Sequence, residues 1–64
     1  MEFNTHEYEM SHSKQPRGWG QWAFSALRNP DSNQLVWFNG SYGEAKKFAR
    51  AHYRGKTTVI YVQP

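Results

Sequence analysis

The chain contains no cysteine and no long apolar run. Without cysteine, neither a disulfide framework nor a thiolate metal site can stabilise so short a chain, and the redox compartment is left open. The longest uninterrupted apolar stretch runs only from Leu35 to Phe38, whereas a membrane span needs roughly 18 residues. The N-terminus also lacks the basic and then apolar pattern of a secretory signal. We therefore expect a cytoplasmic protein with no membrane association.

Acidic residues are scarce in most of the chain. Residues 1–13 hold Glu2, Glu7 and Glu9 and no lysine or arginine. Residues 14–64 carry all 8 basic residues against only Asp31 and Glu44, a net charge of +6 by subtraction of 2 from 8. Such an excess favours a polyanionic partner such as nucleic acid, with solubility alone as the alternative explanation.

The acidic and basic parts of the chain also differ in their hydrophobic pattern. Residues 1–15 are polar and show no period of two or 3.6, so they are predicted to form a disordered acidic tail. Pro16 and Gly18 mark the boundary of a single small domain over residues 16–64. His6 and His12 in the tail lack the fixed geometry that metal ligands need. No metal and no cofactor are predicted.

Alternation and turn residues define the first half of the domain. Residues 19–28 and 35–39 are predicted strands, and residues 29–33 concentrate turn formers between them. Ser41 followed by Glu44 is a capping box, which predicts that a helix begins there.

The second half of the domain is a helix followed by a strand. The helix is amphipathic and outwardly basic, and Gly55 is suited to end it. Residues 57–63 are β-branched and aromatic, which indicates a further strand. The predicted class is α+β, with the order strand, strand, helix, strand. Its three-stranded antiparallel sheet would carry one helix on one face.

One helix covers only one face of such a sheet, which leaves the other face open. The predicted core is Trp22, Phe24, Val36, Phe38, Ala45, Phe48, Ala49, Ile60 and Val62. The predicted open face is Trp19, Ala23, Ser25, Leu27, Leu35, Trp37, Val59 and Tyr61. Tryptophan on an open face suggests a binding partner, although a thin core also needs large aromatic residues.

Six short stretches of the domain share a pattern with a known family. They are Trp19-Gly20-Gln21-Trp22-Ala23, Arg28-Asn29-Pro30, Val36-Trp37, Gly40-Ser41-Tyr42, Glu44-Ala45 and Ala49-Arg50. They resemble the Apetala-type, ethylene-response-factor DNA-binding domain of plants and its phage-integrase and homing-endonuclease relatives. The resemblance implies that a three-stranded sheet enters the DNA major groove, and it nominates Arg17, Trp19, Trp22, Arg28 and Trp37 as contacts. The arginine-rich first strand of that family has no counterpart before Trp19.

The helix and the last strand are similar to a second family. The matching residues are Glu44-Ala45, Phe48-Ala49, Tyr53, Val59, Val62 and Pro64. They resemble the small RNA polymerase inhibitors of T-odd coliphages, which implies the same element order after a flexible tail and a protein target. Those inhibitors use an acidic strip, whereas this chain has Lys46, Lys47 and Arg50 in the corresponding region.

The sequence offers no set of residues for catalysis. No nucleophile has an evident base and orienting group, and the glycines form no phosphate-binding loop. We therefore expect a non-enzymatic DNA-binding protein of the phage or mobile-element type that docks its open sheet face on duplex DNA. Its predicted contacts are Arg17, Trp19, Arg28, Trp37 and Tyr61, with Lys46, Lys47 and Arg50 as electrostatic support. The alternatives are an inhibitor of a host enzyme such as RNA polymerase, and a homodimer closed by two open faces.

Overall fold

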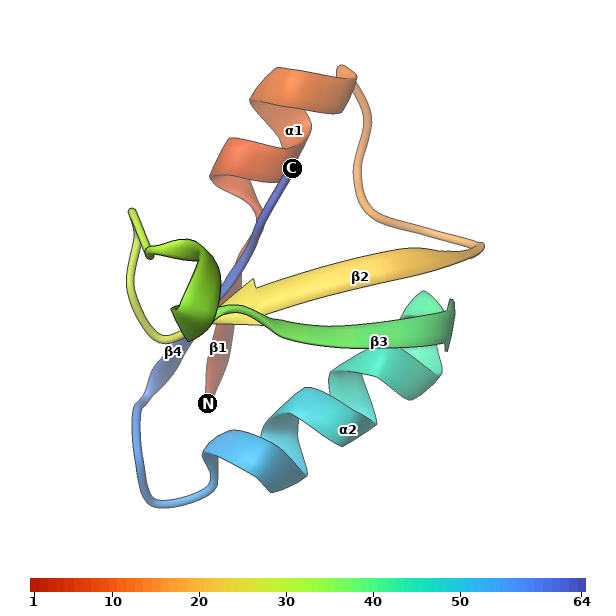
Figure 1. The fold of residues 1–64 in the computed structure, drawn as a ribbon. Helices are drawn as coiled ribbons and strands as arrows, with labels where there is room; N and C mark the ends of the chain where they lie inside the picture. Colours follow the sequence, from red (N-terminus) through yellow and green to blue (C-terminus); the bar gives the residue numbers. More distant parts are fainter.

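The computed structural model, which describes residues 1–64, contains four strands, two α-helices and one short 3-10 helix. The strands are β1 (Glu2–Asn4), β2 (Trp19–Ser25), β3 (Val36–Ser41) and β4 (Val59–Val62). The helices are α1 (His6–His12), η1 (Ser32–Gln34) and α2 (Tyr42–Tyr53). The strands form one mixed sheet in the order β1-β4-β2-β3 (Figure 1).

The predicted α+β class is confirmed, but the sheet differs from the prediction. It is four-stranded and mixed rather than three-stranded and antiparallel, because β1 pairs with β4 in parallel. Residues 1–15, which were predicted to be disordered, supply both β1 and α1. Phe3 of β1 packs edge-on against Phe24, with 6.1 Å between the ring centroids. A three-residue strand is too short to show an alternating pattern, so the sequence did not reveal it.

The core lies between the sheet and α2. Its buried members are Trp22, Phe24, Ala45, Ala49, Tyr53, Ile60 and Val62, with Val36 and Phe38 packed against them. Strand alternation therefore points the expected side chains inward, and most of the predicted core is confirmed. Phe48 differs, because it is 37% exposed and stacks on Phe38 at the margin of the core.

Half of the predicted capping box forms at the start of α2, because the Glu44 side chain bonds the hydroxyl of Ser41 and not its backbone N–H. The Ser41 hydroxyl accepts a hydrogen bond from the Glu44 amide at 3.1 Å, and it also donates to the Glu44 carboxylate at 3.1 Å. These contacts satisfy a free N–H group of the first turn. The helix then runs antiparallel to β3 beneath the sheet.

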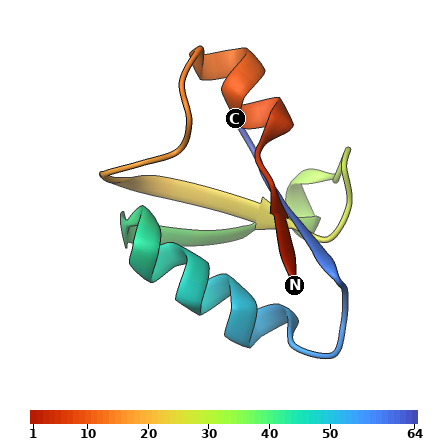
Figure 2. The ribbon, with the colours of Figure 1, turned by 180° about the vertical axis from the view of Figure 1, so that it is seen from behind.

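Trp22 connects the two helices. Its ring centroid lies 5.7 Å from that of Tyr8 in α1 and 4.9 Å from that of Tyr42 in α2. Its indole N–H donates to the Gly40 carbonyl at 2.9 Å. The two helices lie on opposite sides of the β2–β3 hairpin in both views (Figures 1 and 2). α1 lies beside β2, where Tyr8 packs against the core, and Tyr8 and His12 border the face that was predicted to be open.

Candidate functional site

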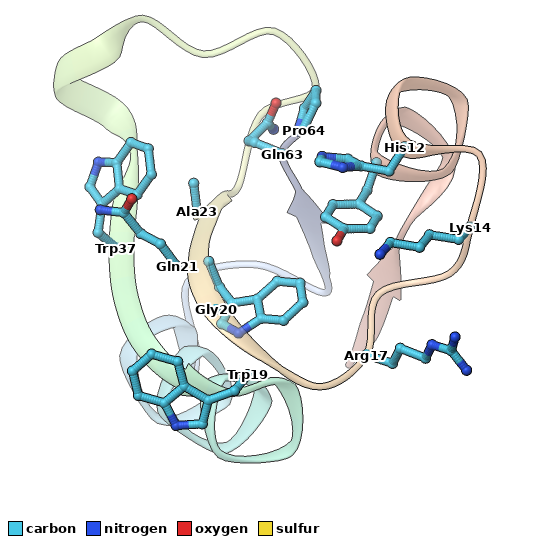
Figure 3. Close-up of a pocket in the computed structure, with 12 residues that line it drawn as sticks. His12, Lys14, Arg17, Trp19, Gly20, Gln21, Ala23, Trp37, Gln63 and Pro64 are labelled. Carbon is cyan, nitrogen blue, oxygen red and sulfur yellow. The ribbon is translucent and has the colours of Figure 1, made fainter.

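The open face of β2 and β3 holds a hollow of about 480 Å³ (Figure 3). Its α1 side is lined by Tyr8, His12, Lys14 and Arg17. Its sheet side is lined by Trp19, Gly20, Gln21, Trp22, Ala23, Trp37, Gln63 and Pro64. The floor is therefore a strand, and one wall is formed by a helix and the loop that follows it.

The hollow exists because β4 ends early. β4 pairs with β2 at Phe24 and Ser25, and the Gln63 backbone amide donates to Ala23 O at 2.9 Å just beyond it. The first half of β2 therefore has no neighbouring strand on that side. The Tyr42 amide donates a hydrogen bond to Gly18 O at 2.8 Å. In an antiparallel ladder every second residue directs its backbone N–H and C=O groups toward the partner strand, and this bond shows which residues of β2 do so. By that alternation, the backbone N–H and C=O groups of Trp19 and Gln21 point away from β3. A ligand in the hollow can reach these groups.

Two of the three tryptophans are exposed beside the hollow. Trp19 is 77% exposed and Trp37 is 53% exposed, whereas Trp22 is only 4% exposed and belongs to the core. Both exposed indoles belong to the face opposite α2, as the alternation predicted. Ala23 and Ser25, which were also predicted on the open face, are buried instead. Large apolar side chains left in water on one face are typical of a binding surface.

The hollow is bordered by positive charge. Lys14 and Arg17 lie across it from Trp37, with the Lys14 side chain directed toward the sheet and the Arg17 side chain directed away from it (Figure 3). No aspartate or glutamate side chain lines the hollow. The structure contains one ion pair, between Arg28 and Glu7, so Lys14 and Arg17 have no acidic partner. His12 stacks on Tyr8 with 4.1 Å between centroids. The arrangement combines flat aromatic surfaces with unpaired cations.

Arg28 and Tyr61 form a separate cluster rather than lining the hollow. The Arg28 guanidinium donates to Glu7 of α1 at 3.0 Å and lies 5.3 Å from the centre of the Tyr61 ring. Gln63, which lines the hollow, donates its side-chain amide to Ser25 Oγ at 3.0 Å, and Ser25 is the neighbour of Tyr61 across β2 and β4. The two predicted contact residues therefore help to hold α1 against the sheet.

The predicted basic residues of the helix lie elsewhere. The Lys46 ammonium is 5.1 Å from the centre of the Tyr42 ring, and the Arg50 guanidinium is 5.2 Å from that of Phe3. Lys47 is exposed. All three belong to α2, which packs on the other face of the sheet from the hollow. The structure thus brings together Arg17, Trp19 and Trp37, but not the helix cations.

Sequence reasoning missed several residues of the site. Tyr8, His12 and Lys14 were placed in the disordered tail, and Gln21 and Gln63 were not singled out. Tyr8 and His12 are four residues apart, a spacing that places side chains on one face of a helix. That aromatic pair was the available signal for α1.

Two tyrosines have raised pKa values for structural reasons. Burial raises the pKa of Tyr42, with smaller contributions from Glu9 and Tyr8, while Arg50 acts in the opposite direction. Burial alone raises the pKa of Tyr53, whose hydroxyl donates to Phe24 O at 3.4 Å. Neither residue lines the hollow. Both remain neutral and support the packing of α2.

Comparison of the chain with protein families, with curated proteins and with solved structures found no match. No three histidine, aspartate or glutamate side chains lie close enough together to hold a metal ion. No helix in the chain is both long enough and apolar enough to cross a membrane.

Proposed function

We propose that the chain is a small, non-enzymatic DNA-binding protein that receives unpaired bases of a nucleic-acid strand in the hollow of its open sheet face. The observation that carries this proposal is the joint position of Trp19 and Trp37. They are 77% and 53% exposed beside a hollow that is also lined by Lys14 and Arg17 and by no aspartate or glutamate side chain.

The shape of the face favours a single strand over the duplex expected from sequence. A sheet that reads the major groove must enter a cleft about 12 Å wide. Here α1 and the loop that carries Lys14 border β2 as a wall, so the face is concave where a groove-reading sheet is flat or convex. Exposed indoles stack on bases that are unpaired, and each stacked base contributes about 1–3 kcal/mol.

The positions of the cations indicate which side of the hollow the phosphate backbone of a bound strand would follow. Lys14 and Arg17 lie on the wall facing Trp37, so phosphates would follow that wall while bases turn toward the sheet. The free backbone groups of Gln21 then face the base edges. The more distant Lys46, Lys47 and Arg50 add to the positive field without touching the ligand.

Fluorescence anisotropy of a labelled mixed-sequence 12-mer tests this proposal. We expect the single strand to bind more tightly than the matching duplex. Trp37→Ala should weaken binding by about 5- to 150-fold, which is the equivalent of 1–3 kcal/mol of stacking. Trp37→Phe should retain much of the affinity because it keeps an aromatic face.

Two further outcomes would redirect the proposal. Tighter binding of the duplex than of the single strand would contradict the proposal and support the major-groove mode expected from the sequence. Equal affinity of the wild type, Trp19→Ala and Trp37→Ala would show that the open face is not the contact surface. Lys47→Ala is the matched charge control, since Lys47 is an exposed cation on the helix face away from the hollow.

The second candidate function is inhibition of a host enzyme such as RNA polymerase. The same two exposed indoles favour it, because tryptophan is enriched among the residues that dominate protein interfaces. Binding to purified RNA polymerase without nucleic acid, abolished by Trp37→Ala, would support this candidate. Binding of DNA alone with the same sensitivity would support the first.

A further inference from the structure

The outer edge of β3 has no partner in the fold. β3 is the last strand of the sheet and pairs only with β2. The same alternation that frees Gln21 points the backbone N–H and C=O groups of Trp37, Asn39 and Ser41 outward. β3 contains no charged residue and no proline, which are the usual means by which edge strands avoid pairing.

One side of α2 lies along the outer edge of β3. Glu44, Phe48 and His52 are spaced four residues apart and so lie in a row along the helix. Phe48 stacks on Phe38 of β3 at 5.1 Å between centroids, and its ring lies 6.2 Å from that of His52. Phe48 nevertheless remains 37% exposed.

The opposite side of α2 is directed elsewhere. Arg50 reaches Phe3 in β1, the strand at the other edge of the sheet. The row of Glu44, Phe48 and His52 is therefore the side of the helix that flanks β3.

We propose that β3 pairs with β3 of a second copy of the chain, antiparallel about a two-fold axis at Asn39. Two identical strands related by such an axis are antiparallel by symmetry, and the contact is the same on both sides. Trp37 then lies opposite Ser41 of the second copy. The sheet becomes continuous across the two chains.

Charge complementarity along this row favours a second copy of the chain as the partner of β3. Because Phe48 is level with Phe38, it lies next to the two-fold axis, and the two α2 helices run antiparallel beside each other. Phe48 then meets its counterpart, while Glu44 faces His52 of the second copy at both ends of the row. A carboxylate opposite a protonated imidazole is a favourable pair, and β3 places no charged side chain between the two strands.

The pairing also joins the two hollows, although it does not itself depend on the proposed function. Ser41 of each copy pairs with Trp19 of the same copy on β2. Trp37 and the second copy's Trp19 are therefore two strands apart, about 10 Å at the usual strand spacing. A nucleic-acid strand would therefore meet two cross-strand pairs of exposed indoles, each formed by Trp19 of one copy and Trp37 of the other.

Sedimentation equilibrium without nucleic acid tests the dimer. The expected mass is twice that of the 7.5 kDa chain as concentration rises. Asn39→Lys places like charges opposite each other at the axis and should raise the dissociation constant more than about tenfold. Gln21→Lys is the matched control, because Gln21 is the neighbour of Asn39 on β2 and adds the same charge away from the edge.

A charge exchange tests the helix contact. His52→Glu sets carboxylates opposite each other and should weaken the dimer, and the double variant with Glu44→Lys should restore it. Circular dichroism verifies that each variant is folded, since Glu44 also caps α2.

A wild type that stays monomeric up to about 1 mM would overturn the proposal. A dimer unaffected by Asn39→Lys would overturn pairing at this edge and indicate contact through the open faces instead. Neither result bears on DNA binding, which is measured separately.

Discussion

At Gly40 the backbone of β3 adopts a φ of +152°, a conformation that side chains rarely tolerate. A Cβ atom there would lie 2.8 Å from the Phe38 ring. Gly40→Ala should therefore lower the free energy of unfolding by more than about 1 kcal/mol. Urea denaturation measures the change. Equal stability of this variant and the wild type would show that β3 relaxes around the new methyl group.

Gly43→Ala is the matched control for Gly40→Ala. It lies in the first turn of α2, and nothing stands within 4 Å of a Cβ built there. Gly43→Ala should raise the free energy of unfolding by about 0.5–1 kcal/mol, because alanine loses less backbone entropy in a helix. Changes of opposite sign in the free energy of unfolding of the two variants would distinguish steric crowding at Gly40 from the effect of conformational entropy at Gly43.

The half-buried Tyr42 and the buried Tyr53 make stability depend on pH in the alkaline range. The pKa values of Tyr42 and Tyr53 are raised above the ordinary value of 10.0, so the unfolded chain ionises first. Their contribution to stability is complete below pH 10 and is lost as the pH rises above it. The free energy of unfolding should fall less steeply above pH 10 in the Tyr42→Phe, Tyr53→Phe double variant than in the wild type. Parallel curves would contradict this assignment.

At the scale of the element, α1 is a short helix held by few contacts. Tyr8 provides the main one, since it packs against Trp22 and stacks on His12. Tyr8→Ala should lower the free energy of unfolding by about 1–3 kcal/mol and speed hydrogen exchange of the α1 amides. Because α1 forms a wall of the hollow, nucleic-acid affinity should fall with it.

Met10 is the control within the same helix. It is 70% exposed, so Met10→Ala should change stability by no more than about 0.5 kcal/mol. If both variants exchange α1 amides equally fast, packing on Trp22 is not what orders the helix. The Arg28–Glu7 pair would then be the remaining anchor, although such exposed pairs contribute only about 0–1 kcal/mol.

At the scale of the whole molecule, charge governs how the protein meets a polyanion. The chain carries a net charge of +3, and Lys14 and Arg17 are its cations at the hollow. The logarithm of the single-strand association constant should fall linearly with the logarithm of salt concentration. Lys14→Ala should reduce that slope by about 0.7, the value of one phosphate contact on a single strand. An unchanged slope would place Lys14 outside the path of the backbone.

The sequence determined the elements with a long enough pattern to be read. Alternation in β2 and β3 assigned Trp22 and Phe24 to the core and Trp19 and Trp37 to the other face, and the capping box at Ser41 located the start of α2. These features are local, because side-chain period and helix capping act over a few neighbouring residues.

Only the tertiary structure decided how the first 15 residues are used and what shape the open face has. β1 holds three residues, and it forms a strand because β4 offers an edge. The separation of the α2 cations from the hollow likewise depends on which face the helix covers. The hollow follows from the length of β4, which leaves the first half of β2 unpaired beside α1. Such features arise between segments far apart in the chain, where no local pattern of residues records the contact.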